Sequence, residues 1–471
     1  MQETVLIKNA KIVRPEGTFE GSVGIDGGKI TYIGDASHFL QADRVIDAKG
    51  LHLLPGAIDT HIHLGAFGKK HNLPTFKEEI DAFKCAVIGG VTTIGNHLGM
   101  GDTAWEQSLK PKLKEWIDLI NTYAIPNFFF HIGVVSDIQI EEIPDYVRDF
   151  GVTSFKWYAY SRGEQETWSM TEITDGDMFL GFKKIASLGD KVLAMRHCEN
   201  MEVIDKLRQQ LKDKDGRTDL KAWYESRPGF VEALDIRKVA YMGKITGAHV
   251  YIVHVSSKEG VEAVRLAKKE GIHISSETCI HYLTHNIEDA AHLGPLGVES
   301  PSLKDPESNV RLWEALADGT IDCIGTDSGA MTKTHKSHTV WDALAGFTED
   351  TPLVLPVLLS EGVNKGRLSI NQVVKSVSYN SSVIHGLWPR KGAILPGFDA
   401  DLVLVDVNKT QEVTLDRLHY ALSDFSLFEG WKLKGWPVMT MINGEVAMRD
   451  GEILVKPGIG KYLPRSAERV V

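Results

Sequence analysis

The sequence predicts an α/β protein: a (β/α)8 TIM barrel with a small composite β-sandwich domain built from both ends of the chain. From about residue 55 to residue 389, apolar strands alternate with helical segments, which is typical of a parallel barrel. Both chain ends instead show short strands joined by tight turns. The 471 residues also exceed one ordinary core, so a large domain plus an accessory unit is expected.

The two chain ends each contain strand-like segments that could not bury two sheet faces alone. Their turns include Asp26-Gly27-Gly28 and Asn443-Gly444. The segments are 5–8, 10–13, 22–25 and 29–33 at the start, and 400–405, 438–442 and 445–448 at the end. We therefore expect them to pair into one domain, with boundaries at 1–54 and 390–471 around a barrel at 55–389.

The middle of the chain contains apolar runs that are typical of buried parallel strands. They lie at 91–94, 127–132, 154–157, 192–197, 249–254, 273–277 and 321–326. Amphipathic stretches such as 261–269 and 310–317 separate them and favour helices. About eight such units in this length predict a barrel, whose active site would lie at the carboxyl ends of the strands.

The segment that follows Pro55 carries two histidines, His61 and His63, one residue apart on the first barrel strand. Alternate side chains of a strand point to the same side, so the two imidazoles would converge. Such a pair can bind a transition metal, although a strand end with two polar residues facing water would look the same.

Four further strands end in residues that can bind a metal ion. These are Lys156, His197, His254 and Asp327. Singly, each has an ordinary explanation, since strand ends are often polar and lysines often reach for solvent. All of them at the same predicted edge of one barrel favour a metal centre.

This order of residues resembles the amidohydrolase superfamily over essentially the whole chain. Binuclear members of this superfamily hold two metal ions. The resemblance implies that in this chain His61, His63 and Asp327 bind a buried ion, and that His197 and His254 bind a more exposed one. Two divalent ions are thus expected, with zinc as the first choice and manganese as the alternative.

The resemblance also makes Lys156 a carboxylated bridge between the two ions. Nearby cations disfavour the charged amine, and a neutral amine can capture CO2 and become an anionic oxygen ligand. Two ions that share a water lower its pKa towards neutrality, so hydroxide can attack the substrate. Asp327 would take the proton and return it to the leaving nitrogen.

Further motifs are similar to the cyclic amidohydrolases of the hydantoinase and dihydropyrimidinase family. They occur at residues 196–200, 226–228, 252–257, 277–279, 361–367, 386–392 (Gly-Leu-Trp-Pro-Arg-Lys-Gly), 399–402 and 426–431. The resemblance implies hydrolysis of a ring C–N bond in a hydantoin, dihydropyrimidine or related imide, giving an N-carbamoyl acid or an analogous product. The alternatives are allantoinase or another amidase for a bulkier ring, and a non-catalytic structural relative.

Two comparisons within the superfamily bear on these alternatives. Dihydroorotases usually place an arginine after the histidine pair, where Leu64 and Gly65 stand here, so that activity is disfavoured. Non-catalytic relatives lose metal ligands, whereas all six positions are filled in this chain.

Several predicted substrate contacts depart from the family pattern. In the family, a tyrosine that supports the oxyanion usually lies five residues after the metal-bridging lysine. Here Tyr160 lies four residues after Lys156 and is the first choice, with Tyr158 as the alternative. Ser300 is expected to contact the ring amide, while Lys304 replaces an arginine and Ser328 replaces a histidine. These changes favour a ring other than plain dihydrouracil.

Composition bears on location and partners. The formal charge of -11 disfavours nucleic acid and an anionic membrane surface. The N-terminus lacks a basic and apolar leader pattern, and the four cysteines form no CxxC pair, so a cytoplasmic protein with reduced thiols is expected. The family resemblance further implies a homotetramer or homodimer.

Overall fold

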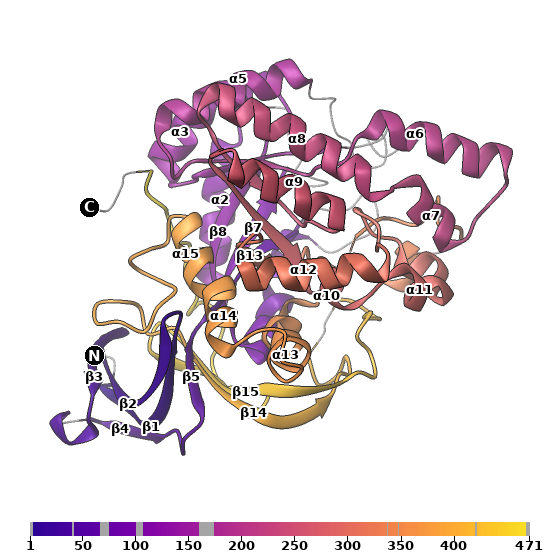
Figure 1. The fold of residues 1–471 in the computed structure, drawn as a ribbon. Helices are drawn as coiled ribbons and strands as arrows, with labels where there is room; N and C mark the ends of the chain where they lie inside the picture. The colour runs from indigo at the N-terminus through magenta and orange to yellow at the C-terminus, as the bar shows by residue number, and fades with distance from the viewer. Residues whose placement is uncertain are drawn as a thin grey trace.

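The computed structural model describes residues 3–39, 42–65, 75–99, 107–159, 174–336, 338–346, 348–419 and 422–467. It contains one sheet of eight parallel strands and a second, mixed sheet of nine strands. Helices surround the eight-stranded sheet, and the mixed sheet lies at one side of it beside the N-terminus (Figure 1). The predicted barrel with a composite β-domain is confirmed.

The barrel strands follow one another around the sheet in chain order. They are β6 (Ala57–Ile62), β7 (Val91–Leu98), β8 (Asn127–Gly133), β9 (Ser154–Trp157), β10 (Leu193–Arg196), β11 (His249–Ile252), β12 (Ile274–Cys279) and β13 (Cys323–Gly325). Every residue of these strands is buried, which fits the apolar sequences of most of them. A parallel bridge between Ile62 and Ser328 closes the ring between its first and last strands.

The helices pack outside the strands, and most connect one strand to the next. They are α1 (Phe76–Ala82), α2 (Lys110–Tyr123), α3 (Asp137–Phe150), α5 (Asp175–Leu188), α6 (Met201–Gln209), α7 (Leu220–Ser226), α8 (Gly229–Thr246), α9 (Lys258–Lys269), α10 (Ile280–Thr284), α11 (Ile287–Ala290), α12 (Pro306–Asp318), α13 (Val354–Val357), α14 (Ile370–Val374) and α15 (Asn380–Ile384). No helix among the described residues is both long enough and apolar enough to cross a bilayer.

Helix caps set the short connections at the carboxyl ends of two strands. The Asn200 side chain accepts a hydrogen bond from the Val203 N–H and starts α6 soon after β10. Ser257 starts α9 in the same way, only five residues after β11 ends. These early helix starts hold the intervening residues in place at the barrel rim.

The nine-stranded sheet combines strands from both ends of the chain. In order they are β17 (Glu452–Ile453), β16 (Glu445–Arg449), β15 (Lys432–Ile442), β14 (Leu402–Glu412), β5 (His52–Pro55), β1 (Val5–Arg14), β2 (Gly17–Asp26) and β3 (Lys29–Gly34), while β4 (Arg44–Asp47) pairs with β1. The N-terminal and C-terminal halves join where β5 pairs antiparallel with β14. Only Gly56 separates β5 from the first barrel strand, β6.

The first strand differs from its prediction. Two strands were expected at 5–8 and 10–13, but the structure has one, β1, from Val5 to Arg14. Asn9 adopts a left-handed backbone with a φ of 58°, and the pairing with β2 shifts between Ile7 and Ala10. Asparagine tolerates this conformation, so the polar interruption is a bulge within a strand rather than a turn between two.

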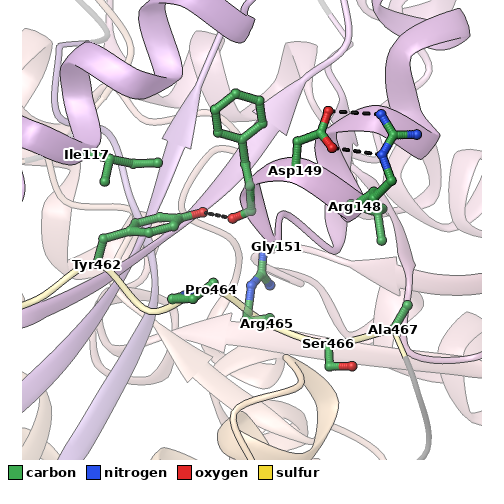
Figure 2. A pocket seen from close by; sticks show the side chains of 11 residues that line it. Ile117, Arg148, Asp149, Gly151, Tyr462, Pro464, Arg465, Ser466 and Ala467 are labelled. Carbon is green, nitrogen blue, oxygen red and sulfur yellow. Dashed lines mark hydrogen bonds and ion pairs between the residues drawn. The ribbon is translucent and has the colours of Figure 1, made fainter.

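The C-terminal tail leaves the mixed sheet and returns to the amino-terminal end of the barrel. The Leu463 N–H donates to the Phe128 carbonyl at 2.7 Å, and the Tyr462 hydroxyl donates to the Phe150 carbonyl at 2.9 Å. The tail and the end of α3 line a cavity of about 560 Å³. Figure 2 shows the tail residues of this cavity beside Arg148 and Asp149. This end of the barrel is opposite the strand ends that carry the candidate metal ligands.

Candidate metal centre

Three side chains from the first and last barrel strands meet at the carboxyl end of the barrel. The Nε2 atoms of His61 and His63 lie 3.1 Å apart. Oδ1 of Asp327 lies 3.1 Å from Nε2 of His61 and 2.9 Å from Nε2 of His63. These donor atoms all lie within 4.8 Å of one another, so one ion could contact all three.

Barrel closure brings these residues together. The Asp327 N–H donates to the His61 carbonyl at 2.8 Å, and the His63 N–H donates to the Ser328 carbonyl at 2.8 Å. Asp327 has a φ of 57°, and His254 has a φ of 40°, both rare for residues with a side chain. Such strained conformations concentrate at functional sites, and here they occur just beyond β13 and β11.

Lys156 approaches the same group from β9. It is 1% exposed, and its Nζ lies 2.9 Å from Nε2 of His61. Burial lowers the pKa of Lys156 to about 8, although the nearby Asp327 and Glu277 carboxylates act in the opposite direction. A substantial fraction of the amine is therefore neutral at mildly alkaline pH, the form that reacts with CO2.

A second histidine pair stands beside the first. The ring centroids of His197 and His254 are 4.6 Å apart, and those of His61 and His254 are 5.5 Å apart. Both residues lie one or two positions beyond the ends of β10 and β11, whereas the sequence placed them within those strands. Nε2 of His197 contacts Oε2 of Glu199 at 2.9 Å, which leaves Nδ1 for another partner.

Protonation in this pocket follows from burial and from the carboxylates. Burial lowers the pKa of His63 to about 4 and also lowers the pKa of His197 and His254, so these imidazoles are neutral near pH 7. Burial and Lys156 would lower the pKa of His61, but Asp327 and Glu277 raise it. Burial opposes ionisation of Asp327, yet His61 and His63 hold its pKa well below its ordinary value.

The residues present fit a pair of divalent ions. Neutral imidazoles and an ionised carboxylate are the form in which these groups bind zinc-like metals. In the described part of the chain, Nδ1 of His63 and Nδ1 of His254 are buried with no hydrogen-bond partner. The nitrogen of His63 that faces the other candidate ligands is Nε2, which lies 2.9 Å from Oδ1 of Asp327.

Comparison with known proteins agrees with this geometry. The Amidohydrolase family model matches residues 217–447. A D-hydantoinase of Geobacillus stearothermophilus is 32% identical, covering 98% of this chain and 97% of that protein. The solved L-hydantoinase (dihydropyrimidinase) from Arthrobacter aurescens is 30% identical with a TM-score of 0.90, covering 98% of this chain and 99% of that one. The chain belongs to the hydantoinase/dihydropyrimidinase family of amidohydrolases.

Another relative of this hydantoinase-family chain bears on its substrate. The allantoinase of Escherichia coli K12 is 29% identical, covering 95% of each chain. That level is close to the identity with the hydantoinases, so overall identity does not separate the two activities.

The residues expected to contact substrate are only partly described. Tyr160 lies outside the described residues. Tyr158 is buried, with its ring centroid 6.3 Å from that of His63. Ser300 follows η6 (Ala291–Gly297), and its hydroxyl donates to Oε2 of Glu199 at 3.1 Å. The Lys304 amine is buried and donates to the Arg227 carbonyl at 2.6 Å, so it holds its own loop in place.

Sequence reasoning missed several residues around the hydantoinase-family site. His97 lies near the end of β7, with its ring centroid 4.2 Å from that of His61. Both of its ring nitrogens are buried without a hydrogen-bond partner among the described residues. The expected strand ended at residue 94, and extending it to the next turn would have placed His97 with the other strand-end histidines. Glu277 and Glu199 were present in the quoted motifs, but their contacts depend on the tertiary structure.

Proposed function

We propose that this chain hydrolyses a ring C–N bond of a hydantoin, a dihydropyrimidine or a related cyclic imide, releasing an N-carbamoyl acid or an analogous product. The observation that carries the proposal is the buried group of His61, His63 and Asp327 with the Lys156 amine beside it. The hydantoinase relatives, which share the whole length of the chain, support the reaction class.

The proposed ligand set holds two divalent ions. His61, His63 and Asp327 would hold the buried ion, and His197 and His254 the more exposed one. Carboxylated Lys156 would join the two, consistent with a buried amine whose pKa is about 8. Zinc suits these nitrogen and oxygen donors, and manganese is the alternative.

The protein's own groups then act on the substrate and its protons. When bound, the ions supply Lewis acidity that activates water near neutral pH and polarises the ring carbonyl. Asp327 is ionised, so it can accept the proton from the attacking water and return it to the ring nitrogen as the C–N bond breaks. Tyr160, or Tyr158 in its place, would donate a hydrogen bond to the developing oxyanion. Ser300 would contact the ring amide.

Allantoinase activity is the second candidate. An allantoinase is nearly as similar to the chain as the hydantoinases are. In addition, Lys304 is committed to the Arg227 carbonyl and Ser328 stands beside Asp327, so two substrate-side positions differ from the family pattern. A ring with a larger substituent would suit such a changed pocket.

A substrate panel tests the reaction. The purified enzyme, loaded with zinc or manganese, is assayed with dihydrouracil, hydantoin, 5-substituted hydantoins and allantoin. Ring opening of one of them supports a cyclic amidase, and the preferred ring identifies which. Full metal loading with no turnover on any ring would refute the proposal and favour a non-catalytic relative.

Metal analysis of Lys156→Ala tests the bridge. We expect about two ions per wild-type chain and loss of most of the metal and activity in the variant, with partial recovery in added formate or acetate. Because an alanine cannot be carboxylated, a fully loaded variant with an unchanged rate would refute the role of Lys156.

Location and assembly are also proposals. The four cysteines are buried and free of disulfides, in keeping with a reducing, cytoplasmic environment. A homotetramer or homodimer rests on family resemblance, and its mass in solution would decide between them.

A further inference from the structure

Two buried glutamates lie behind the candidate metal ligands, one beside each proposed ion. We propose that Glu277 and Glu199 are positioning residues. Each would hold one ligand histidine, His61 or His197, in the tautomer that leaves its other ring nitrogen free for an ion. This inference rests on the ligand set given under Proposed function.

Glu277, on β12, is fully buried and accepts hydrogen bonds at both carboxylate oxygens. Oε1 contacts Nδ1 of His61. Oε2 accepts from the hydroxyl of Thr60 and, at 2.8 Å, from the hydroxyl of Tyr251. A carboxylate can only accept hydrogen bonds, so His61 must carry its hydrogen on Nδ1. In the neutral imidazole Nε2 is then the nitrogen without a hydrogen, and an ion held with His63 and Asp327 would contact this atom.

Glu199 makes the corresponding contacts around His197, but to the opposite ring nitrogen. Its Oε2 accepts from Nε2 of His197 at 2.9 Å, from the Arg227 guanidinium at 2.9 Å and from the Ser300 hydroxyl at 3.1 Å. His197 therefore carries its hydrogen on Nε2 and has Nδ1 free. The two ligand histidines would use different nitrogens, Nε2 in His61 and Nδ1 in His197.

The two carboxylates differ in what else they hold. Besides His61, Glu277 holds the buried hydroxyls of Thr60 and Tyr251, two residues on barrel strands. Glu199 instead holds Ser300, the residue expected to contact the ring amide. Loss of Glu199 should therefore disturb substrate binding as well as one ion, whereas loss of Glu277 should disturb one ion alone.

Glutamine variants separate these roles, because an amide keeps the shape but turns one acceptor into a donor. In Glu277→Gln the new NH2 group would face the N–H of His61 or a hydroxyl donor, so two donors would meet. In Glu199→Gln the new NH2 group would likewise face one of the donors that now bond to Glu199. Substitution of a residue that hydrogen-bonds to a metal ligand typically lowers metal affinity by about 10- to 100-fold. We expect a loss of that size for one ion in each variant.

A matched control is available in Glu349. It is also fully buried, and its Oε2 accepts from the backbone N–H groups of Leu422 and Ser423 at 2.9 and 2.7 Å. Glu349→Gln removes the same charge from a comparably buried position. Both metal affinities should stay within about twofold of the wild type in this variant.

The experiment is a Co²⁺ titration of metal-free full-length protein in competition with a chromophoric chelator, followed by visible absorption. A wild-type chain that does not bind two ions refutes the proposed function and not this inference alone. Given two ions, Glu277→Gln should weaken one of them, and Glu199→Gln should weaken the other and raise KM. Unchanged affinities, or equal loss of both ions in each variant, would overturn the inference.

Two milder variants keep the inference testable if a glutamine variant does not fold. Tyr251→Phe removes one donor from Glu277, and Ser300→Ala removes one donor from Glu199. Each should cause a smaller loss at the same ion as its glutamine counterpart. An affinity for both ions equal to the wild type, in either variant, would contradict the role of the glutamate concerned.

Discussion

Leu463 tests whether the C-terminal tail is part of the barrel's packing. Its side chain is fully buried and packs with Ile58, Phe129 and Leu387 at the amino-terminal end of the barrel. Leu463→Ala removes most of that side chain. The variant leaves the backbone hydrogen bond to the Phe128 carbonyl intact, so it isolates the apolar contact.

The expected loss follows from burial. Replacing a fully buried leucine by alanine costs about 2–5 kcal/mol, and the lower part of the range applies where neighbours can close the cavity. The cavity would lie beside the C-terminal tail, a single segment that can shift more readily than a barrel strand, so we expect about 2–3 kcal/mol. Unfolding entropy of about 2 cal/mol/K per residue makes that a fall in Tm of roughly 2–3 °C for a chain of 471 residues.

The assay is thermal unfolding followed by circular dichroism at matched scan rate, concentration and metal load. Leu454→Ala is the control, because Leu454 belongs to the same C-terminal region but is 53% exposed. Its Tm should change by less than about 1 °C. Activity at 25 °C should be unchanged in both variants, since neither residue lies at the metal end. Equal shifts for the two leucines would refute the packing role of the tail.

Three further predictions concern charge, metal and chemistry. Although burial opposes ionisation of Asp399, Lys391 at 2.9 Å and other cations lower its pKa to about 2. The stability that this ionised carboxylate provides is present above about pH 4 and is lost as the pH falls to about 2. The free energy of unfolding in urea should therefore vary less with pH over that range in Asp399→Asn than in the wild type. Chelation should abolish activity and lower Tm, and zinc or manganese should restore both; an apo-enzyme with wild-type Tm would contradict a buried metal centre. Steady-state kinetics of Tyr160→Phe and Tyr158→Phe should show a fall in kcat of about 10²- to 10³-fold in the variant that loses the oxyanion donor. Equal and small losses of kcat in the two variants would exclude both tyrosines as that donor.

The barrel and the position of its candidate metal ligands could be predicted because both depend on local sequence. Alternating apolar strands and helices indicate the barrel, and the strand ends place His61, Lys156 and Asp327 on one side of it. The rings of His197 and His254 lie beside that of His61, as the predicted grouping requires, although each residue lies just beyond its strand. The left-handed backbone of His254 is a tertiary outcome that no residue pattern encodes.

Other parts of the site could not be predicted, because they depend on contacts between distant segments. The bond between His61 and Glu277 joins residues more than 200 positions apart. The hydrogen bond from Ser300 to Glu199 likewise depends on how two loops meet. Asn9 shows the limit at short range, since a polar residue between apolar runs is equally consistent with a turn and with a bulge.

The pairing of β5 with β14 has a consequence for how the protein matures during synthesis. Pro55 faces Leu402 across this pairing, and Gly56 alone connects Pro55 to the strand that bears His61. During translation, β5 has no β14 to pair with until the residues from 402 onwards have left the ribosome. One edge of β5 can pair with β1 early, but the other edge stays open until β14 has been made. The sheet beside the histidine-bearing strand is therefore completed only late in synthesis, so full metal affinity should also arise late.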